Sequence, residues 1–136
     1  VAPGGVVHAV DVQPEMLERL QAHARQEGIT NIVAVLASEQ EVRLPASSID
    51  LALPVDVYHE LAHPVEMMAS VVRALRPGGR VVLVEYRAED PRVPIKPLHK
   101  MSEAQIRREM AVHPLVRERT SDVLPWQHIL VFGRPG

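Results

Sequence analysis

The segment HELAH, residues 59–63, places two histidines four positions apart, with a glutamate directly after the first. On a continuous helix this spacing brings both imidazoles to one face, where they can bind zinc while the glutamate activates water. Catalytic zinc also needs a third protein ligand. The metal ligands in this hypothesis are drawn from His59, His63, His99 and His128.

A proline follows the motif directly and argues against a helical HELAH. Inside a continuing helix, Pro64 would clash with the carbonyl of Glu60 and remove its hydrogen bond, at a cost of roughly 3 kcal/mol. The sequence therefore predicts a loop or irregular turn at HELA, with His63 at the entry to the next helix. A repurposed zinc-dependent hydrolase stays open as an alternative.

A second chemical signal is Asp11, which ends an apolar run and precedes a helix that begins at Pro14. In nucleotide-binding α/β folds an acidic residue at the carboxyl end of a strand holds a ribose, because a carboxylate accepts hydrogen bonds from two hydroxyls. The alternative is that Asp11 only caps the helix. Such folds also use a glycine-rich loop from the preceding strand, and VAPGG at residues 1–5 does not supply it.

Other polar residues adjoin predicted strands. Asp56, Tyr58, His59 and Glu60 follow the third strand, where they could face a substrate or merely hydrogen-bond within a loop. Glu85 lies inside an apolar run, and a buried carboxylate needs a partner or a raised pKa. Arg87 is the simplest partner, and Trp126 is expected to be a core anchor.

Short apolar runs alternate with helical stripes, a pattern typical of βαβ units around a mostly parallel sheet. Pro14 marks the start of the first helix and Gly28 its end. Pro54 should interrupt the third strand or place it at an edge of the sheet. Ser102 and Gln105 form a capping box for the last helix. We expect strands at 6–10, 32–36, 49–55 and 80–86, a tight turn at 77–79, and an antiparallel hairpin of 115–119 with 128–132.

Composition indicates one ordinary domain over residues 1–136, with 46% hydrophobic and 24% charged residues. There are no cysteines, so thiolate metal sites and disulfides are excluded. A net charge of −2 with scattered basic residues gives no electrostatic basis for nucleic-acid binding. No apolar run of about 18 residues and no signal-like segment is present, so we expect a cytoplasmic protein without membrane contact.

Several motifs together carry a family resemblance: AVDVQPEML at 9–17, LPASSIDLAL at 44–53, DVYHEL at 56–61 and LRPGGRVVLVEYR at 75–87. KPLHKMSEAQIRRE at 96–109 and LPWQHILVF at 124–132 extend it. The chain resembles small bacterial class I S-adenosylmethionine-dependent methyltransferases, close to the ubiquinone/menaquinone-biosynthesis and arsenite methyltransferase branch. The resemblance implies a Rossmann-like fold and methyl transfer to a small molecule.

The resemblance also implies roles for particular residues. Asp11 would bind the ribose of S-adenosylmethionine, Val12 would flank the adenine, and Glu39 is a looser match for the residue that meets the adenine amino group. The segment containing Tyr58, His59 and Glu60 would face the methyl acceptor. Because methyl transfer from a sulfonium depends on in-line positioning and desolvation, little dedicated catalytic machinery is expected.

The resemblance departs at the front, where the first βα unit of the family fold is missing. That strand would lie between the strands expected at 6–10 and 49–55, so both inner edges would be left open. We expect these edges to pair with each other or to be covered in a homodimer or strand-exchanged oligomer. The alternatives are a segment of a longer protein, or a non-catalytic remnant that only assembles.

Overall fold

The N-terminal part of the chain is a βαβ unit. In the computed structural model, which describes residues 1–136, β1 (Val7–Asp11) leads into α1 (Pro14–Gln26), and β2 (Ile32–Leu36) pairs parallel with β1. Helix α1 begins at a proline, whose missing N–H would have no partner in the first turn. Gly28, at φ +68°, follows its end. These elements agree with the sequence expectations.

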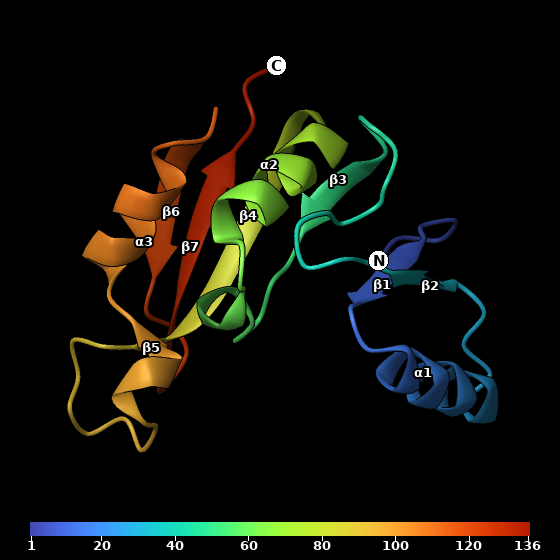
Figure 1. Cartoon of the computed structure of the whole chain (residues 1–136), viewed down its shortest axis with the longest axis horizontal. Coiled ribbons are helices and arrows are strands. Elements are labelled where there is room, and N and C mark those ends of the chain that lie inside the picture. The colour runs from blue at the N-terminus through green and yellow to red at the C-terminus, as the bar shows by residue number, and fades with distance from the viewer.

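A second, larger sheet holds the rest of the strands (Figure 1). Its order is β3 (Ile49–Ala52), β4 (Leu75–Arg87), β7 (Gln127–Gly133) and β6 (Val116–Ser121), and the short β5 (Lys100–Met101) pairs with the end of β4. Strand β3 runs parallel to β4, whereas β7 is antiparallel to β4 and β6. The mixed Rossmann-like sheet with an antiparallel C-terminal hairpin is therefore confirmed.

The Pro77-Gly78-Gly79 segment is an irregularity within β4 instead of a separate tight turn. Pairing with β3 jumps from Ile49–Leu75 to Leu51–Arg80, so the strand bulges between these positions. Gly78 takes φ +82°, a conformation that glycine adopts at no steric cost. The bulge lets β4 begin directly after the second helix and still enter the sheet.

The core lies between this sheet and two helices, α2 (Pro64–Ala74) and α3 (Glu103–Met110). The Ser102 hydroxyl accepts a 3.0 Å hydrogen bond from the Gln105 N–H, as the predicted capping box requires. None of the helices combines the length and apolar character needed to cross a bilayer. The main core cluster is Tyr58, Met68, Leu75, Val81, Leu83, Met101, Ile106, Met110, Leu130 and Phe132.

The two sheets do not join (Figure 1). Strand β1 pairs only with β2, and β3 pairs only with β4, so direct pairing of the two inner edges is not observed. Strand β3 also ends before Pro54, as the missing proline N–H predicts, and only an isolated bridge from Val55 to Val84 continues its path. Apolar side chains beside the two open edges are exposed, among them Val7, Val10, Leu51, Leu53 and Val55.

Candidate active site

Five of the polar residues that the sequence singled out, Asp56, Tyr58, His59, Glu60 and Glu85, lie where β3 and β4 end. Asp56 takes φ +53°, a left-handed conformation that aspartate tolerates better than most residues, and this bend turns the chain away from the sheet. A 3-10 turn, η1 (Tyr58–Glu60), follows it. The Gln127 side chain donates a 2.6 Å hydrogen bond to Asp56 Oδ2, which ties this bend to β7. Ligands of open α/β sheets bind at such carboxyl strand ends.

Glu85 holds His59 in place. The carboxylate is 0% exposed, and its Oε1 accepts the backbone N–H of His59 at 3.1 Å while its Oε2 lies 2.8 Å from His59 Nδ1. When Glu85 is ionised it is acceptor-only, and Nδ1 then carries the proton in this pair. The other ring nitrogen, Nε2, is then left with its lone pair at the open end of the site.

Burial shifts two pKa values in this region. Desolvation raises the pKa of Glu85 above its ordinary value, and the hydrogen bonds from His59 oppose that rise. Desolvation also raises the pKa of the Tyr58 hydroxyl, and the neighbouring Glu109 carboxylate adds to the effect. The Tyr58 hydroxyl donates a 3.1 Å hydrogen bond to Glu109 Oε1 on α3. Tyr58 is thus a neutral, buried residue that fixes the turn and has no exposed reactive group.

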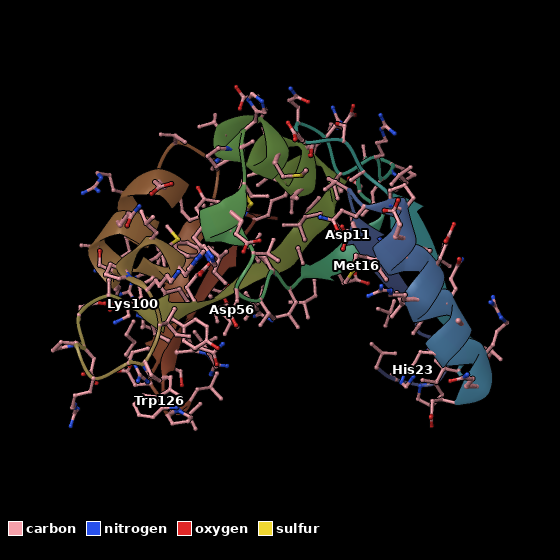
Figure 2. The ribbon with its side chains drawn as sticks, turned by 60° about the horizontal axis from the view of Figure 1, so that its bottom comes forward. Asp11, Met16, His23, Asp56, Lys100 and Trp126 are labelled. Atoms are coloured by element: carbon pink, nitrogen blue, oxygen red, sulfur yellow. The ribbon has the colours of Figure 1, made fainter.

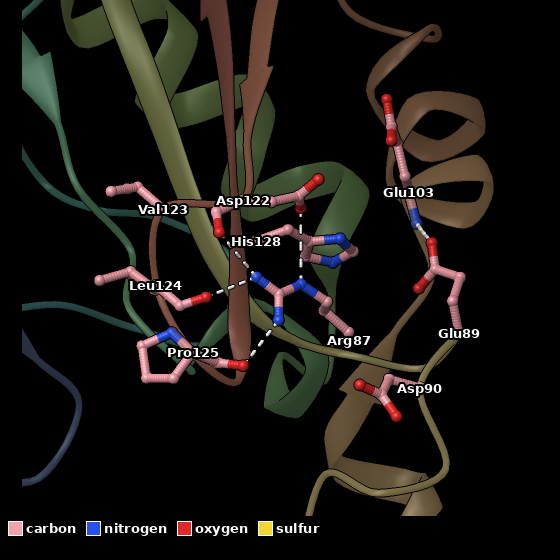
Figure 3. Close-up of a pocket in the computed structure, with 9 residues that line it drawn as sticks. All are labelled: Arg87, Glu89, Asp90, Glu103, Asp122, Val123, Leu124, Pro125 and His128. Carbon is pink, nitrogen blue, oxygen red and sulfur yellow. Dashed lines mark hydrogen bonds and ion pairs between the residues drawn. The ribbon is translucent and has the colours of Figure 1, made fainter.

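The structure corrects the predicted partner of Glu85. Arg87 does not contact it; its guanidinium binds the carbonyls of Asp122, Leu124 and Pro125 at 3.2, 2.5 and 2.8 Å (Figure 3). These contacts border an open pocket of about 600 Å³ beside the β6–β7 turn. Trp126 is the last residue of that turn and is 43% exposed, so the expectation that it anchors the core is also wrong (Figure 2).

HELAH does not form a zinc-binding helix. Residues 58–60 form η1 and α2 begins only at Pro64, so the two histidines of the motif are not one turn apart on a single helix. His63 Nε2 instead lies 4.0 Å from Glu39 Oε2. His128 is buried on β7, and its Nε2 atom has no hydrogen-bond partner. The histidines therefore do not gather as the zinc-hydrolase hypothesis requires; only His99 comes to His59.

On the smaller sheet, Asp11 occupies the position that the sequence predicted, at the carboxyl end of β1 (Figure 2). Its Oδ1 accepts the Gln13 backbone N–H at 2.9 Å, and its other oxygen accepts no hydrogen bond from the protein. Val12, directly after it, is exposed. A free carboxylate oxygen beside an open apolar side chain fits the ribose and adenine of a nucleoside.

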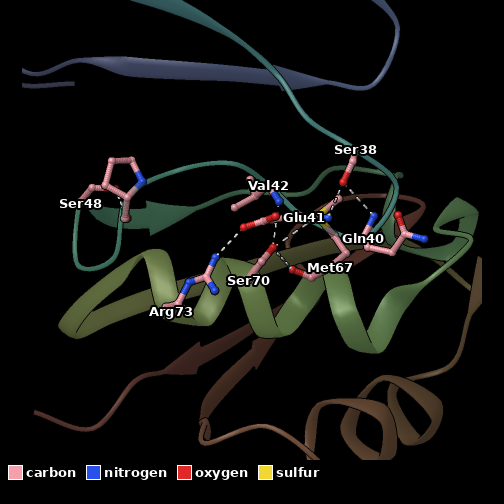
Figure 4. A network of polar contacts seen from close by, with 9 residues as sticks. Ser38, Gln40, Glu41, Val42, Ser48, Met67, Ser70 and Arg73 are labelled. Atoms are coloured by element: carbon pink, nitrogen blue, oxygen red, sulfur yellow. Dashed lines mark hydrogen bonds and ion pairs between the residues drawn. The ribbon is translucent and has the colours of Figure 1, made fainter.

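The loop after β2, which carries Glu39, is tied to α2 (Figure 4). The Ser70 hydroxyl accepts the buried Val42 N–H at 2.9 Å and donates to the Met67 carbonyl at 2.7 Å. Arg73 Nη2 pairs with Glu41 Oε1 at 2.9 Å. Glu39 itself is exposed and follows the carboxyl end of β2, on the same strand ends as Asp11.

The family profile described as "Methyltransferase domain" matches residues 2–83. The match covers β1 through the middle of β4, including Asp11, the 58–60 turn and the glycine bulge. The chain belongs to this family. The family assignment made from AVDVQPEML and LRPGGRVVLVEYR is thereby confirmed.

Curated relatives of this methyltransferase-domain chain include an "uncharacterized methyltransferase" of Mycobacterium tuberculosis, 37% identical over 87 residues. That match covers 64% of this chain and 33% of the relative. A transposon-encoded protein of Streptomyces fradiae is 36% identical over 85 residues, which are 62% of this chain and 24% of that protein. The chain therefore spans a quarter to a third of the length of these relatives.

Solved structures share the fold of the methyltransferase-domain chain. A SAM-dependent methyltransferase from Aquifex aeolicus superposes with a TM-score of 0.89 at 20% identity, over 96% of this chain and 69% of that one. The YcgJ protein of Bacillus subtilis gives a TM-score of 0.74 at 17% identity, over 96% and 82% of the two chains. At these identities the likeness establishes the fold alone.

One feature of the site escaped the sequence prediction, namely the pairing of Glu85 with His59. The buried carboxylate in an apolar strand was a usable signal, since it required a partner. However, the partner lies on a turn that follows a different strand, and no spacing rule links the two positions.

Proposed function

We propose that this methyltransferase-domain chain takes part in methyl transfer from S-adenosylmethionine to a small-molecule acceptor. The observation that carries the proposal is Asp11, whose carboxylate ends β1 with one oxygen left free. The family assignment supports this use of the residue, because the profile match includes Asp11. The cofactor, when bound, supplies the reactive methyl group on its sulfonium.

In this proposal the residues of the chain bind and position. Asp11 accepts hydrogen bonds from the ribose hydroxyls, Val12 packs on one adenine face, and Glu39 accepts from the adenine amino group. The turn with Tyr58, His59 and Glu60 forms the wall on the acceptor side. Tyr58 fixes that turn from below, while His59 and Glu60 are the groups that meet the acceptor and keep water from it.

Calorimetry with S-adenosylmethionine tests the proposal on the chain itself. We expect saturable binding that Asp11→Ala weakens at least tenfold, because the ribose loses its main acceptor. Glu15→Ala is the matched control. Glu15 lies in the first turn of α1, so this substitution removes a nearby carboxylate of the same charge. Absence of cofactor binding, or equal affinities for the two variants, would contradict the proposal.

We also propose that the chain acts as a homodimer or strand-exchanged oligomer. Both inner edges, on β1 and β3, present unpaired backbone groups flanked by exposed apolar side chains. Such edges pair readily with other strands, and a second copy supplies strands with the same apolar character. The geometry of HELAH gives no support to a zinc hydrolase, and a non-catalytic remnant would assemble without binding the cofactor.

A further inference from the structure

Three possible ligand atoms meet at the open end of the acceptor-side turn. His59 Nε2, His99 Nδ1 and a carboxylate oxygen of Glu60 all lie within 4.8 Å of one another. His59 Nε2 is 3.3 Å from His99 Nδ1 and 3.7 Å from Glu60 Oε1. Two nitrogens that each bind a tetrahedral zinc ion at about 2.0–2.1 Å are roughly 3.3 Å apart. The imidazole pair thus already has the spacing of two ligands of one ion.

The buried carboxylate behind His59 prepares that residue as a ligand. Glu85 accepts hydrogen bonds from both the backbone N–H and Nδ1 of His59, so the ring is held at two points. The lone pair on Nε2 consequently faces His99 and Glu60. A carboxylate that binds the outer nitrogen of a histidine fixes its tautomer and raises its basicity, and metal-binding histidines usually have such a partner.

The three ligands differ in exposure in a way that suits capture of an ion from solvent. The His59 side chain is 7% exposed and fixed, whereas the Glu60 side chain is 63% exposed and His99 lies on a surface turn, η2 (Pro97–His99). The imidazole rings meet edge to face, with centroids 5.3 Å apart. Glu60 Oε1 lies 3.7 Å from His59 Nε2, and an exposed side chain is free to adjust its rotamer around an ion while His59 stays bonded to Glu85.

We propose that His59, His99 and Glu60 form a binding site for a divalent transition-metal ion, with Zn²⁺ the ion that two imidazoles and one carboxylate suit well. The site differs from the HExxH pattern because His63 takes no part and Glu60 binds the ion directly. Three protein ligands leave a fourth position open to water or to an oxygen, nitrogen or sulfur atom of another molecule. That this molecule is the methyl acceptor rests on the proposed function.

Titration of the metal-free, tag-free chain with Zn²⁺ alone, followed by calorimetry, tests the site. We expect one ion per chain, and Co²⁺ in its place should give the visible absorption of a four- or five-coordinate ion. His99→Ala should weaken Zn²⁺ binding at least tenfold. Glu85→Gln keeps all three ligands but replaces one of the two accepting oxygens by an amide donor and removes the negative charge, and should weaken Zn²⁺ binding about 10- to 100-fold.

His63→Ala is the matched control, because His63 belongs to HELAH and lies outside the proposed ligand set. We expect its zinc affinity to equal that of the unaltered chain. If Glu85→Gln proves unfolded by circular dichroism, the exposed residue His99 decides the question. The proposal is overturned if the unaltered chain binds no stoichiometric ion, or if His99→Ala binds zinc as tightly; the two imidazoles would then only share a hydrogen bond.

Cofactor and metal titrations of the same samples keep this inference separate from the proposed function. Asp11→Ala should lose S-adenosylmethionine but bind zinc normally, because Asp11 is not one of the ligands. Stoichiometric zinc without any cofactor binding would sustain the metal site and contradict the proposed function. Cofactor binding without zinc binding would support the proposed function and contradict the metal site.

Discussion

At the residue scale, Arg87 is a charged side chain whose contacts are those of a structural residue. Its side chain is 16% exposed, and its guanidinium binds three backbone carbonyls of the β6–β7 turn, with Asp122 Oδ1 3.5 Å from Nε. These carbonyls converge on the planar guanidinium, and no other side chain offers several N–H donors in that fixed arrangement. Arg87 therefore fixes the turn that borders the pocket, and leaves Glu85 free to hold His59.

We predict that Arg87→Lys destabilises the fold by about 1–3 kcal/mol, because a lysine ammonium cannot reach all three carbonyls and partly buried acceptors lose charged partners. Urea denaturation followed by circular dichroism measures the change. Arg92→Lys is the control, since Arg92 is an exposed residue paired only with Asp90. Equal stabilities of the two variants would show that the turn does not depend on this guanidinium.

Asp11 and Glu85 show what residue types can and cannot predict. Asp11 was placed correctly, because the end of a strand and the start of a helix are both visible in neighbouring residues. The burial of Glu85 was also predictable, yet its partner was not, since the choice between Arg87 and His59 depends on where η1 packs against β4. The irregular turn at HELAH, by contrast, was predictable, because Pro64 begins α2 and leaves His63 at the helix entry, as the structure shows.

At the element scale, the loop between β2 and β3 is organised by α2. Ser70 accepts the Val42 N–H inside the secondary core cluster of Val42, Leu44, Met67 and Ala74. At the C-terminal end of α2, the Arg134 guanidinium caps the helix by binding the carbonyls of Val72 and Leu75. The helix is thus held at its middle and at its C-terminal end, and its contact with Val42 fixes the loop that also carries Glu39.

Ser70→Ala should destabilise the protein by about 1–3 kcal/mol, because the buried Val42 N–H would lose its partner without access to water. The free energy of unfolding in urea measures the effect. Ser48→Ala offers a control of the same chemistry, as the Ser48 hydroxyl bonds the Pro45 carbonyl in an exposed loop. A loss no larger than that of Ser48→Ala would mean that the loop is held by its apolar contacts alone.

The elements themselves were largely predictable, because hydrophobic periodicity and helix caps are local signals. The strand 32–36, the α2 boundary at Pro64 and the Ser102 cap all appear as expected. The bulge at 77–79 was not predicted, since its shape depends on simultaneous pairing with β3 and β7. Pairing partners are a property of the assembled sheet.

At the scale of the whole molecule, the notable feature is a sheet in two pieces. Strands β1 and β3 each keep one side without a partner, and the helix α1 covers only the smaller piece (Figure 1). Exposed apolar residues flank both strands. No strand pairing joins the two pieces, and β2 meets the larger piece through Val35, which packs against the cluster of Val42, Leu44, Met67 and Ala74.

We predict that the chain sediments as a dimer at micromolar concentration and that Leu51→Lys shifts it to monomer, because a charge beside the β3 edge opposes strand addition. Sedimentation velocity over a range of concentrations measures this. Val116→Lys makes the same change on β6, the opposite outer strand, and should leave the dimer intact. A monomeric unaltered chain at every concentration would refute the prediction.

The division of the sheet also has a kinetic consequence. In the smaller piece, β1 and β2 are separated only by α1, so a short loop closure brings the partners together. In the larger piece, β4 must find β7 across the whole α3 and β6 region, and such distant pairing is slow. The strands of the βαβ unit can thus pair early, while the His59–Glu85 site awaits the slower sheet.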